Sequence, residues 1–217
     1  MTPPSQKHLR VIATFTAEPL RGPLAHWLRE LGIDLDIRFA DYGQVLQEAL
    51  DPASGSARNA AGGMNVFLLR PSDLGSALEE ALEAIASLAT RSTATQLVLL
   101  CPEHEASVDE AAIAQRFDRL ANAELITASD LASLYPVAQP FDPESDASGH
   151  LPYTDTIFVA AATRIVRSLS ARLRPPVKVL ALDADHTLWS GVCGEDGPQG
   201  LRLDGPWRAL REFALAK

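Results

Sequence analysis

The clearest structural signal in the chain is one stretch near its carboxyl end, Val177-Lys178-Val179-Leu180-Ala181-Leu182-Asp183-Ala184-Asp185-His186-Thr187-Leu188. An apolar run leads directly into the pattern Asp-x-Asp-x-Thr. Such a run predicts a buried parallel strand, and open α/β sheets bind ligands in the crevice beyond the carboxyl ends of their strands. Because side chains alternate along an extended chain, Asp183 and Asp185 are expected to point into the same crevice.

Two carboxylates held this close repel each other unless a cation or a shared proton lies between them. Oxygen-rich sites of this kind usually hold Mg²⁺, so we expect Asp183 and Asp185 to be metal-binding residues. The alternative is an ordinary strand end with acidic turn residues, because a bare Asp-x-Asp-x-Thr often arises by chance. The apolar run before it and Leu188-Trp189 after it favour the metal site.

The chain before this stretch alternates short apolar runs with amphipathic segments, which is typical of α/β layering. Strands are expected over residues 9–14, 34–39, 64–69, 96–101 and 124–127, the last at a sheet edge. Helices are expected over residues 23–31, 42–50, 74–88, 108–120 and 154–173. Residues 51–63 and 134–152 have the composition of loops.

Pro175 and Pro176 end the last of these helices, and we place a domain boundary there, with residues 1–175 before it and 176–217 after it. A typical domain has about 100–150 residues. Residues 176–217 supply only a strand, a glycine-rich segment and the start of a helix. We therefore expect them to be the amino-terminal fragment of a Rossmann-like domain, and the polypeptide by itself to be inactive.

Composition limits the partners and the compartment. Nineteen Lys and Arg against 28 Asp and Glu give a net charge of −9, which argues against binding to nucleic acid or to an anionic membrane. No apolar run approaches the roughly 18 residues of a membrane span, and no export signal is recognisable. Two cysteines cannot form a disulfide framework, so a cytoplasmic location is expected.

The pattern around Asp183 resembles motif I of the haloacid-dehalogenase (HAD) superfamily of phosphatases and phosphotransferases. This resemblance implies that Asp183 is a catalytic nucleophile that forms an aspartyl-phosphate, and that Asp185 is the general acid and base. It also implies that Mg²⁺ is held by the Asp183 carboxylate and the Asp185 main-chain carbonyl. Thr187 would fix the loop by hydrogen bonding.

The run that follows, Trp189-Ser190-Gly191-Val192-Cys193-Gly194-Glu195-Asp196-Gly197, corresponds to the flap of the HAD fold. Together with motif I it resembles the FkbH-like branch of the superfamily, subfamily IIIC, except that His186 stands where the family has Asn. Several segments of the first domain also resemble the start of these proteins: residues 13–20, 27–28, 39–45, 50–54, 65–66 with 70, and 149–154. The resemblance therefore covers nearly the whole chain.

The FkbH-like resemblance implies a specific reaction. These enzymes take 1,3-bisphosphoglycerate, remove phosphate and load the glyceryl group onto the phosphopantetheine thiol of an acyl carrier protein for polyketide biosynthesis. Cys193 in the flap is the candidate if a cysteine carries the acyl group. Two alternatives remain open: a generic HAD phosphatase of small phosphate esters, and a scaffold that binds a carrier protein without catalysis.

In this family the first domain is flavodoxin-like and related to SGNH hydrolases, which need a Gly-Asp-Ser nucleophile after the first strand and a late Asp-x-x-His. Here the first turn is Thr14-Phe15-Thr16, and Asp146 and His150 are one residue too far apart. Thr16 and His150 could form a nucleophile–base pair. The more ordinary interpretation is that Thr16 is a cap and His150 bonds within its loop, so a binding or scaffolding role is favoured over hydrolysis.

Arg70 and a group of four arginines on the last helix of the first domain each have a functional and a structural interpretation. Arg70 follows a buried strand at the crevice edge, where it could bind a phosphate or carboxylate or form an internal salt bridge. The last helix of the first domain carries Arg164, Arg167, Arg172 and Arg174. These could bind an acidic carrier protein. The favoured alternative is that they are solvated cations that suit the dipole at the carboxyl end of the helix.

Overall fold

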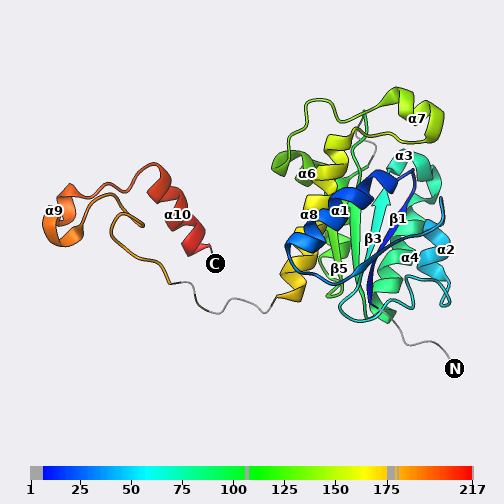
Figure 1. The fold of residues 1–217 in the computed structure, drawn as a ribbon, viewed down its shortest axis with the longest axis horizontal. Helices are drawn as coiled ribbons and strands as arrows, with labels where there is room; N and C mark the ends of the chain where they lie inside the picture. The colour runs from blue at the N-terminus through cyan, green and yellow to red at the C-terminus, as the bar shows by residue number, and fades with distance from the viewer. Residues whose placement is uncertain (1–6, 106–107, 175–178, 180, 217) are drawn as a thin grey trace. The chain divides into compact units, whose positions relative to one another are not determined.

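The computed structural model describes residues 7–105, 108–174, 179 and 181–216. The chain divides into two compact units (Figure 1), the first unit being Met1–Leu173 and the second unit Arg174–Lys217. Each unit is described by itself.

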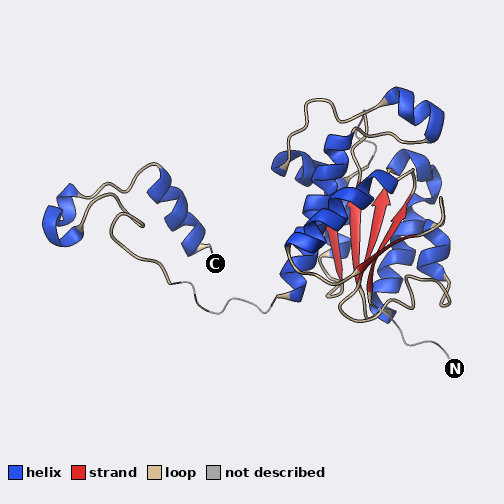
Figure 2. Ribbon diagram, in the orientation of Figure 1, coloured by secondary structure: helices blue, strands red, loops and turns tan. Residues whose placement is uncertain are grey.

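The first unit is built on a five-stranded parallel sheet with helices on both faces (Figure 2), which confirms the predicted α/β fold. Its strands are β1 (His8–Ala13), β2 (Asp36–Phe39), β3 (Met64–Leu69), β4 (Thr95–Leu100) and β5 (Ala123–Ile126), in the order β2-β1-β3-β4-β5. All six residues of the central strand β3 are buried, as expected for a parallel strand covered on both faces. The predicted edge strand is β5, at one end of the sheet.

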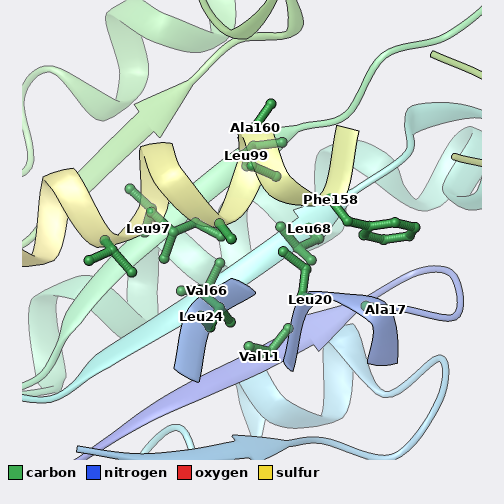
Figure 3. Close-up of a cluster of buried hydrophobic side chains, with 14 of the residues drawn as sticks. Val11, Ala17, Leu20, Leu24, Val66, Leu68, Leu97, Leu99, Phe158 and Ala160 are labelled. Atoms are coloured by element: carbon green, nitrogen blue, oxygen red, sulfur yellow. The ribbon is translucent and has the colours of Figure 1, made fainter. Parts of the chain in front are cut away.

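Five helices make up the two covering layers: α1 (Arg21–Glu30) and α8 (Asp155–Leu173) on one face, and α2 (Val45–Leu50), α4 (Leu78–Arg91) and α5 (Glu110–Phe117) on the other. Alternate strand residues serve the two layers, since Val66 and Leu68 pack in one core cluster and Phe67 in the other. Figure 3 shows the first cluster, in which Leu24 of α1 and Phe158 of α8 lie against the strands. Burial of this apolar surface on both faces holds the sheet in place.

Shorter helical elements connect these layers: η1 (Glu18–Leu20), α3 (Pro71–Leu74), η2 (Gly75–Ala77), α6 (Ala128–Leu134) and α7 (Pro143–Gly149). The prediction that residues 134–152 are all loop was therefore wrong for α7. Asp142 accepts a hydrogen bond from the Ser145 N–H and Pro143 occupies the first turn, so α7 has a well-formed start. It ends at His150, whose φ of 49° is left-handed.

A buried set of side-chain amides lies at the amino ends of the central strands β3 and β4. Asn65 on β3 is the register partner of Gln96 on β4, and its Nδ2 donates to Gln96 Oε1 at 3.0 Å. Asn59 Nδ2 donates to Asn65 Oδ1 at 2.8 Å, while Asn59 Oδ1 accepts from the His8 N–H at 3.1 Å. The loop over residues 51–63, predicted as such, is thereby tied to the sheet.

The second unit contains α9 (Cys193–Gly200), α10 (Pro206–Leu215) and two isolated bridges, Asp185–Trp189 and Ser190–Arg202. Of the strand predicted over 177–182, the structure describes residues 179, 181 and 182, and none of these three is in a strand. A strand needs a hydrogen-bonding neighbour, and the described residues of this unit offer only the two bridges. Across the described ranges, no helix is both long and apolar enough to cross a bilayer.

Candidate functional site

The Asp-x-Asp loop places its two carboxylates in different surroundings. Asp183 is exposed, and within the described residues its side chain has no hydrogen-bond or ion-pair partner. Asp185 is half-buried, and its Oδ1 accepts from the Cys193 main-chain N–H and the Trp189 Nε1–H, both at 3.0 Å. These two donors, the Cys193 N–H first, hold the pKa of Asp185 below its usual value because they stabilise the carboxylate.

A tight turn shapes this loop. The Ala184 carbonyl accepts from the N–H groups of Thr187 at 3.3 Å and Leu188 at 2.9 Å. The contribution of Thr187 to the described loop is thus a main-chain hydrogen bond. His186 has a left-handed φ of 59°, a conformation that Asn, Asp and His adopt more readily than most residues. His186 therefore suits the position at which the resembling family has Asn.

The segment after the loop folds back toward it. Trp207 Nε1 donates to the His186 carbonyl at 3.1 Å, and the Val192 N–H donates to Asp196 Oδ2 at 2.8 Å. Gly191 has a φ of 101°, and a Cβ there would lie 2.8 Å from Asp196 Oδ2, so glycine is required. Cys193 begins α9 and is exposed beside the Asp185 carboxylate that its own N–H holds.

A second cluster lies at the carboxyl ends of β1 and β3 in the first unit. In a sheet of this order the switch point, where successive crossover helices change faces, is between these two strands. Arg70 pairs there with Asp73 at 2.6 Å and Asp146 at 2.7 Å, and its main-chain N–H donates to Thr14 Oγ1. Burial opposes the charge of Arg70, but Asp73 and Asp146 outweigh it and raise the pKa.

His150 completes this cluster. Its Nε2 lies 2.6 Å from Arg70 Nη2 and 3.2 Å from Asp73 Oδ1, and its Nδ1 meets the Tyr42 hydroxyl. Of the two interpretations of Arg70, the described contacts match the internal salt bridge. Sequence reasoning missed Asp73 and Tyr42. Asp73 was visible three residues after Arg70, whereas nothing in the sequence links Tyr42 to His150.

The structure does not bring together the predicted nucleophile–base pair of Thr16 and His150. The Thr16 hydroxyl donates to the Gly149 carbonyl at 2.7 Å, and the Thr16 N–H donates to the His150 carbonyl at 2.9 Å. Both ring nitrogens of His150 face other partners. These contacts tie the turn after β1 to the end of α7, which is a structural role for Thr16.

The arginines of α8 also have partners within the first unit. Glu124 on β5 pairs with Arg164 at 3.0 Å and with Arg172 at 3.5 Å. Arg167 donates to the Tyr135 hydroxyl at 2.9 Å. Arg164 and Arg172 are therefore held by Glu124 rather than solvated at the helix end, and Arg174 lies just beyond the end of α8.

Comparisons with known proteins identify one solved structure with the same fold. No protein-family model matches the chain, and no curated protein matches it significantly. A solved structure does match: the N-terminal part of the protein BF1531 from Bacteroides fragilis, which contains a phosphatase domain and was crystallised with Mg. The TM-score is 0.66 at 16% identity, over 96% of this chain and 64% of that one. The chain thus shares its fold with somewhat less than two thirds of that structure.

Proposed function

We propose that the chain carries the nucleophile loop of a HAD-type phosphatase, with Asp183 attacking the phosphorus of a small phosphate ester. The observation that carries this proposal is the asymmetry of the loop: Asp183 is exposed and Asp185 is held by two donors from the following segment. Neighbouring carboxylates in unlike environments are suited to different roles in one reaction. The shared fold with a protein that contains a phosphatase domain supports the same function.

Each carboxylate has a defined step in this proposal. An Asp183 oxygen bonds to phosphorus as the bond to the leaving oxygen breaks, and Asp185 gives that oxygen its proton. Asp185 then accepts a proton from the water that cleaves the aspartyl-phosphate. The donors from Cys193 and Trp189 favour the ionised Asp185 needed for this second step. The charge of a bound phosphate raises the pKa of Asp185 and so favours the protonated form needed for the first step.

Magnesium fits the donors that this loop offers. The Asp183 carboxylate and the Asp185 main-chain carbonyl are both oxygens, which Mg²⁺ prefers, and Mg²⁺ commonly takes only one or two carboxylates along with water and phosphate oxygens. It therefore does not require a cluster of three acidic, His or Cys side chains, and the described residues contain none. When bound, Mg²⁺ neutralises charge that otherwise repels a phosphate from Asp183.

The test is phosphate release by the full-length protein from small phosphate esters, with and without Mg²⁺. Asp183→Asn is expected to lower turnover by at least ~10³-fold, because it removes the nucleophile. Asp204→Asn is the matched control, since Asp204 is an exposed acid of the same unit and, within the described residues, its ion pair is with the equally exposed Arg202. Full turnover by a folded Asp183→Asn protein would overturn the proposal.

The finer form of the proposal names the substrate and the acceptor. The ordered FkbH-like motifs support a 1,3-bisphosphoglycerate-like substrate. Its carbonyl carbon forms a thioester with the phosphopantetheine thiol of an acyl carrier protein as the C1 acyl phosphate leaves, and hydrolysis of the C3 phosphate ester through Asp183 leaves the glyceryl group. Mass spectrometry of a carrier protein incubated with substrate and enzyme tests this. A glyceryl adduct supports transfer, free phosphate alone supports a generic phosphatase, and binding without either product supports a scaffold.

If Cys193 carries the acyl group, Cys193→Ala abolishes loading. The exposure of Cys193 beside Asp185 supports this role. Unimpaired loading by that variant removes Cys193 from the proposal and leaves the role of Asp183 intact.

A further inference from the structure

A cavity of about 530 Å³ opens beside the carboxyl end of β4 in the first unit. Small-molecule sites commonly occupy about 300–1,000 Å³, and open α/β sheets bind ligands beyond the carboxyl ends of their strands. Every residue that lines the cavity belongs to the first unit, whereas Asp183 belongs to the second. The position and size of the cavity are those of a ligand site, and none of its lining residues has a role in the proposed phosphatase function.

The floor of the cavity is apolar. Leu100 and Cys101 at the end of β4, Leu131 of α6 and Ile157 of α8 line it, and all four are buried. Burial raises the pKa of the Cys101 thiol far above its usual value, so Cys101 contributes as a neutral apolar group. An apolar ligand body gains about 25 cal/mol for each Å² that it buries on such a floor.

The charged groups around the cavity are of one sign. Glu103, Asp109 and Glu110 line it, and within the described residues no Lys, Arg or His does. Of the nearby cations, Arg70 pairs with two aspartates, and Arg167 donates to the hydroxyl of Tyr135, a lining residue, without itself lining the cavity. Carboxylates at the edge of a low-dielectric cavity favour a cation over an anion.

Main-chain donors fix these carboxylates in place. Glu103 Oε1 accepts from the Ser72 N–H at 2.6 Å, Asp109 Oδ1 from the Ala112 N–H at 3.1 Å, and Glu110 Oε1 from the Ala128 N–H at 3.0 Å. A carboxylate has about four acceptor positions, so Asp109 and Glu110 retain capacity for a ligand donor, while Glu103 adds negative charge to the same edge. We propose that this cavity binds a small apolar amine, with its hydrocarbon body on the floor and its ammonium group at the carboxylates.

The first experiment compares three probes of matched size with the full chain at neutral pH: benzylammonium, benzyl alcohol and benzoate. Amide chemical shifts are followed by NMR during each titration. Benzylammonium is expected to shift the amides of Ala128 and Ser129 and to bind at least ~5-fold more tightly than benzyl alcohol, with benzoate weakest. Equal binding of the three probes, or shifts that avoid the cavity residues, would overturn the proposal.

Two pairs of variants locate the site and its charge. Ala132 is exposed on α6 and lines the cavity, so Ala132→Trp fills it, whereas its neighbour Ser133 does not line it. Ala132→Trp is expected to weaken benzylammonium binding by at least ~10-fold, and Ser133→Trp to leave it unchanged. Unchanged binding by a folded Ala132→Trp protein contradicts the site.

The second pair changes charge alone. Glu103→Gln keeps an acceptor oxygen for the Ser72 N–H but removes the negative charge, and the exposed Glu105, which does not line the cavity, supplies the control Glu105→Gln. Glu103→Gln is expected to weaken benzylammonium binding several-fold and to leave benzyl alcohol binding unchanged. If Glu103→Gln weakens benzylammonium and benzyl alcohol binding to the same extent, the proposed contact between the ammonium group and the carboxylates is contradicted. None of these measurements depends on phosphate release, so they stand or fall apart from the phosphatase proposal.

Discussion

Glu48 shows how single residues of the first unit tolerate buried charge. Its carboxylate accepts from Arg10 Nε at 2.8 Å, and from the Ser56 N–H at 3.0 Å and the Ser56 hydroxyl at 2.7 Å. Burial by itself raises the pKa of Glu48, but the bonds from Arg10 and Ser56 outweigh it, and the net pKa lies below the ordinary value of 4.5. The ionised form is therefore part of the folded structure.

The depressed pKa of Glu48 predicts a pH dependence of stability. Because the folded-state pKa is below the unfolded one, ionised Glu48 stabilises the fold above pH 4.5, and this contribution is lost as the pH falls through the folded pKa. Glu48→Gln is expected to lower the free energy of unfolding by about 1–3 kcal/mol at neutral pH. Urea unfolding should show this difference shrinking below about pH 4. A difference that is independent of pH contradicts the prediction.

Replacement of Arg70 is expected to lower the free energy of unfolding by more than replacement of Glu48. Its side chain is 16% exposed and that of Asp73 is 11% exposed, so Arg70→Met leaves largely buried carboxylates without their cation. The expected loss in the free energy of unfolding is about 2–4 kcal/mol. Arg29, in an exposed pair with Glu30, is the control, and Arg29→Ala should change stability by no more than about 0.5 kcal/mol. Equal losses of unfolding free energy in Arg70→Met and Arg29→Ala would refute the stabilising role of the buried Arg70 salt bridges.

At this scale the sequence could predict which residues stand at strand ends but not their partners. Arg70 was expected at the crevice edge, yet Asp146 reaches it across 76 residues of sequence. Such contacts are set by how α7 packs over the sheet. The asymmetry between Asp183 and Asp185 likewise depends on Cys193 folding back onto Asp185.

Among the elements, the predicted strands of the first unit agree with the observed ones to within two residues. Continuous apolar runs define the buried central strands β3 and β4, whereas the edge strand β2 alternates exposed and half-buried residues. Helices α6 and α7 were not predicted. Helix α7 consists of Pro143-Glu144-Ser145-Asp146-Ala147-Ser148-Gly149, which has no apolar stripe. Such a helix depends on its caps and tertiary contacts, so hydrophobic periodicity cannot reveal it.

Helix α6 gives a test of capping. Thr127 Oγ1 accepts from the Asp130 N–H, and Asp130 in turn accepts from the Thr127 N–H, which forms a reciprocal capping box. Thr127→Ala is expected to lower the free energy of unfolding by about 1 kcal/mol, and Thr127→Ser, which keeps the hydroxyl, to change it by a few tenths at most. Urea unfolding of both variants checks this. Equal stability of the Ala and Ser variants would show that the cap contributes nothing.

For the molecule as a whole, the two units differ in how much they bury. The first unit has two buried core clusters, whereas every described residue of the second unit is exposed or half-buried. Limited trypsin digestion should therefore cleave after the exposed Arg202 and Arg208 before it cleaves within the sheet. Mass spectrometry of the early fragments identifies which peptide bonds trypsin cleaves first. Early cleavage between β3 and β4 contradicts the prediction.

The alternation of apolar runs and amphipathic segments predicted an α/β fold, and the flavodoxin-like resemblance implied a parallel sheet with flanking helices. Residues 177, 178 and 180 of the predicted second-unit strand lie outside the described ranges. The strand order of the sheet rests on pairings between distant segments, such as β1 with β3, and no local pattern encodes these pairings.

The amide set at the amino ends of the strands bears on the loops at their opposite ends. Because β3 is buried on both faces, a slip of one residue against β4 changes little in apolar burial. It does move Asn65 by about 3.3 Å along the strand, which separates it from Gln96 and Asn59 and leaves buried amides unpaired at about 1–3 kcal/mol each. Asn59, Asn65 and Gln96 thus fix the register of β3 against β4. Because only one register pairs these amides, they determine which residues of the loops at the opposite ends of the strands face each other.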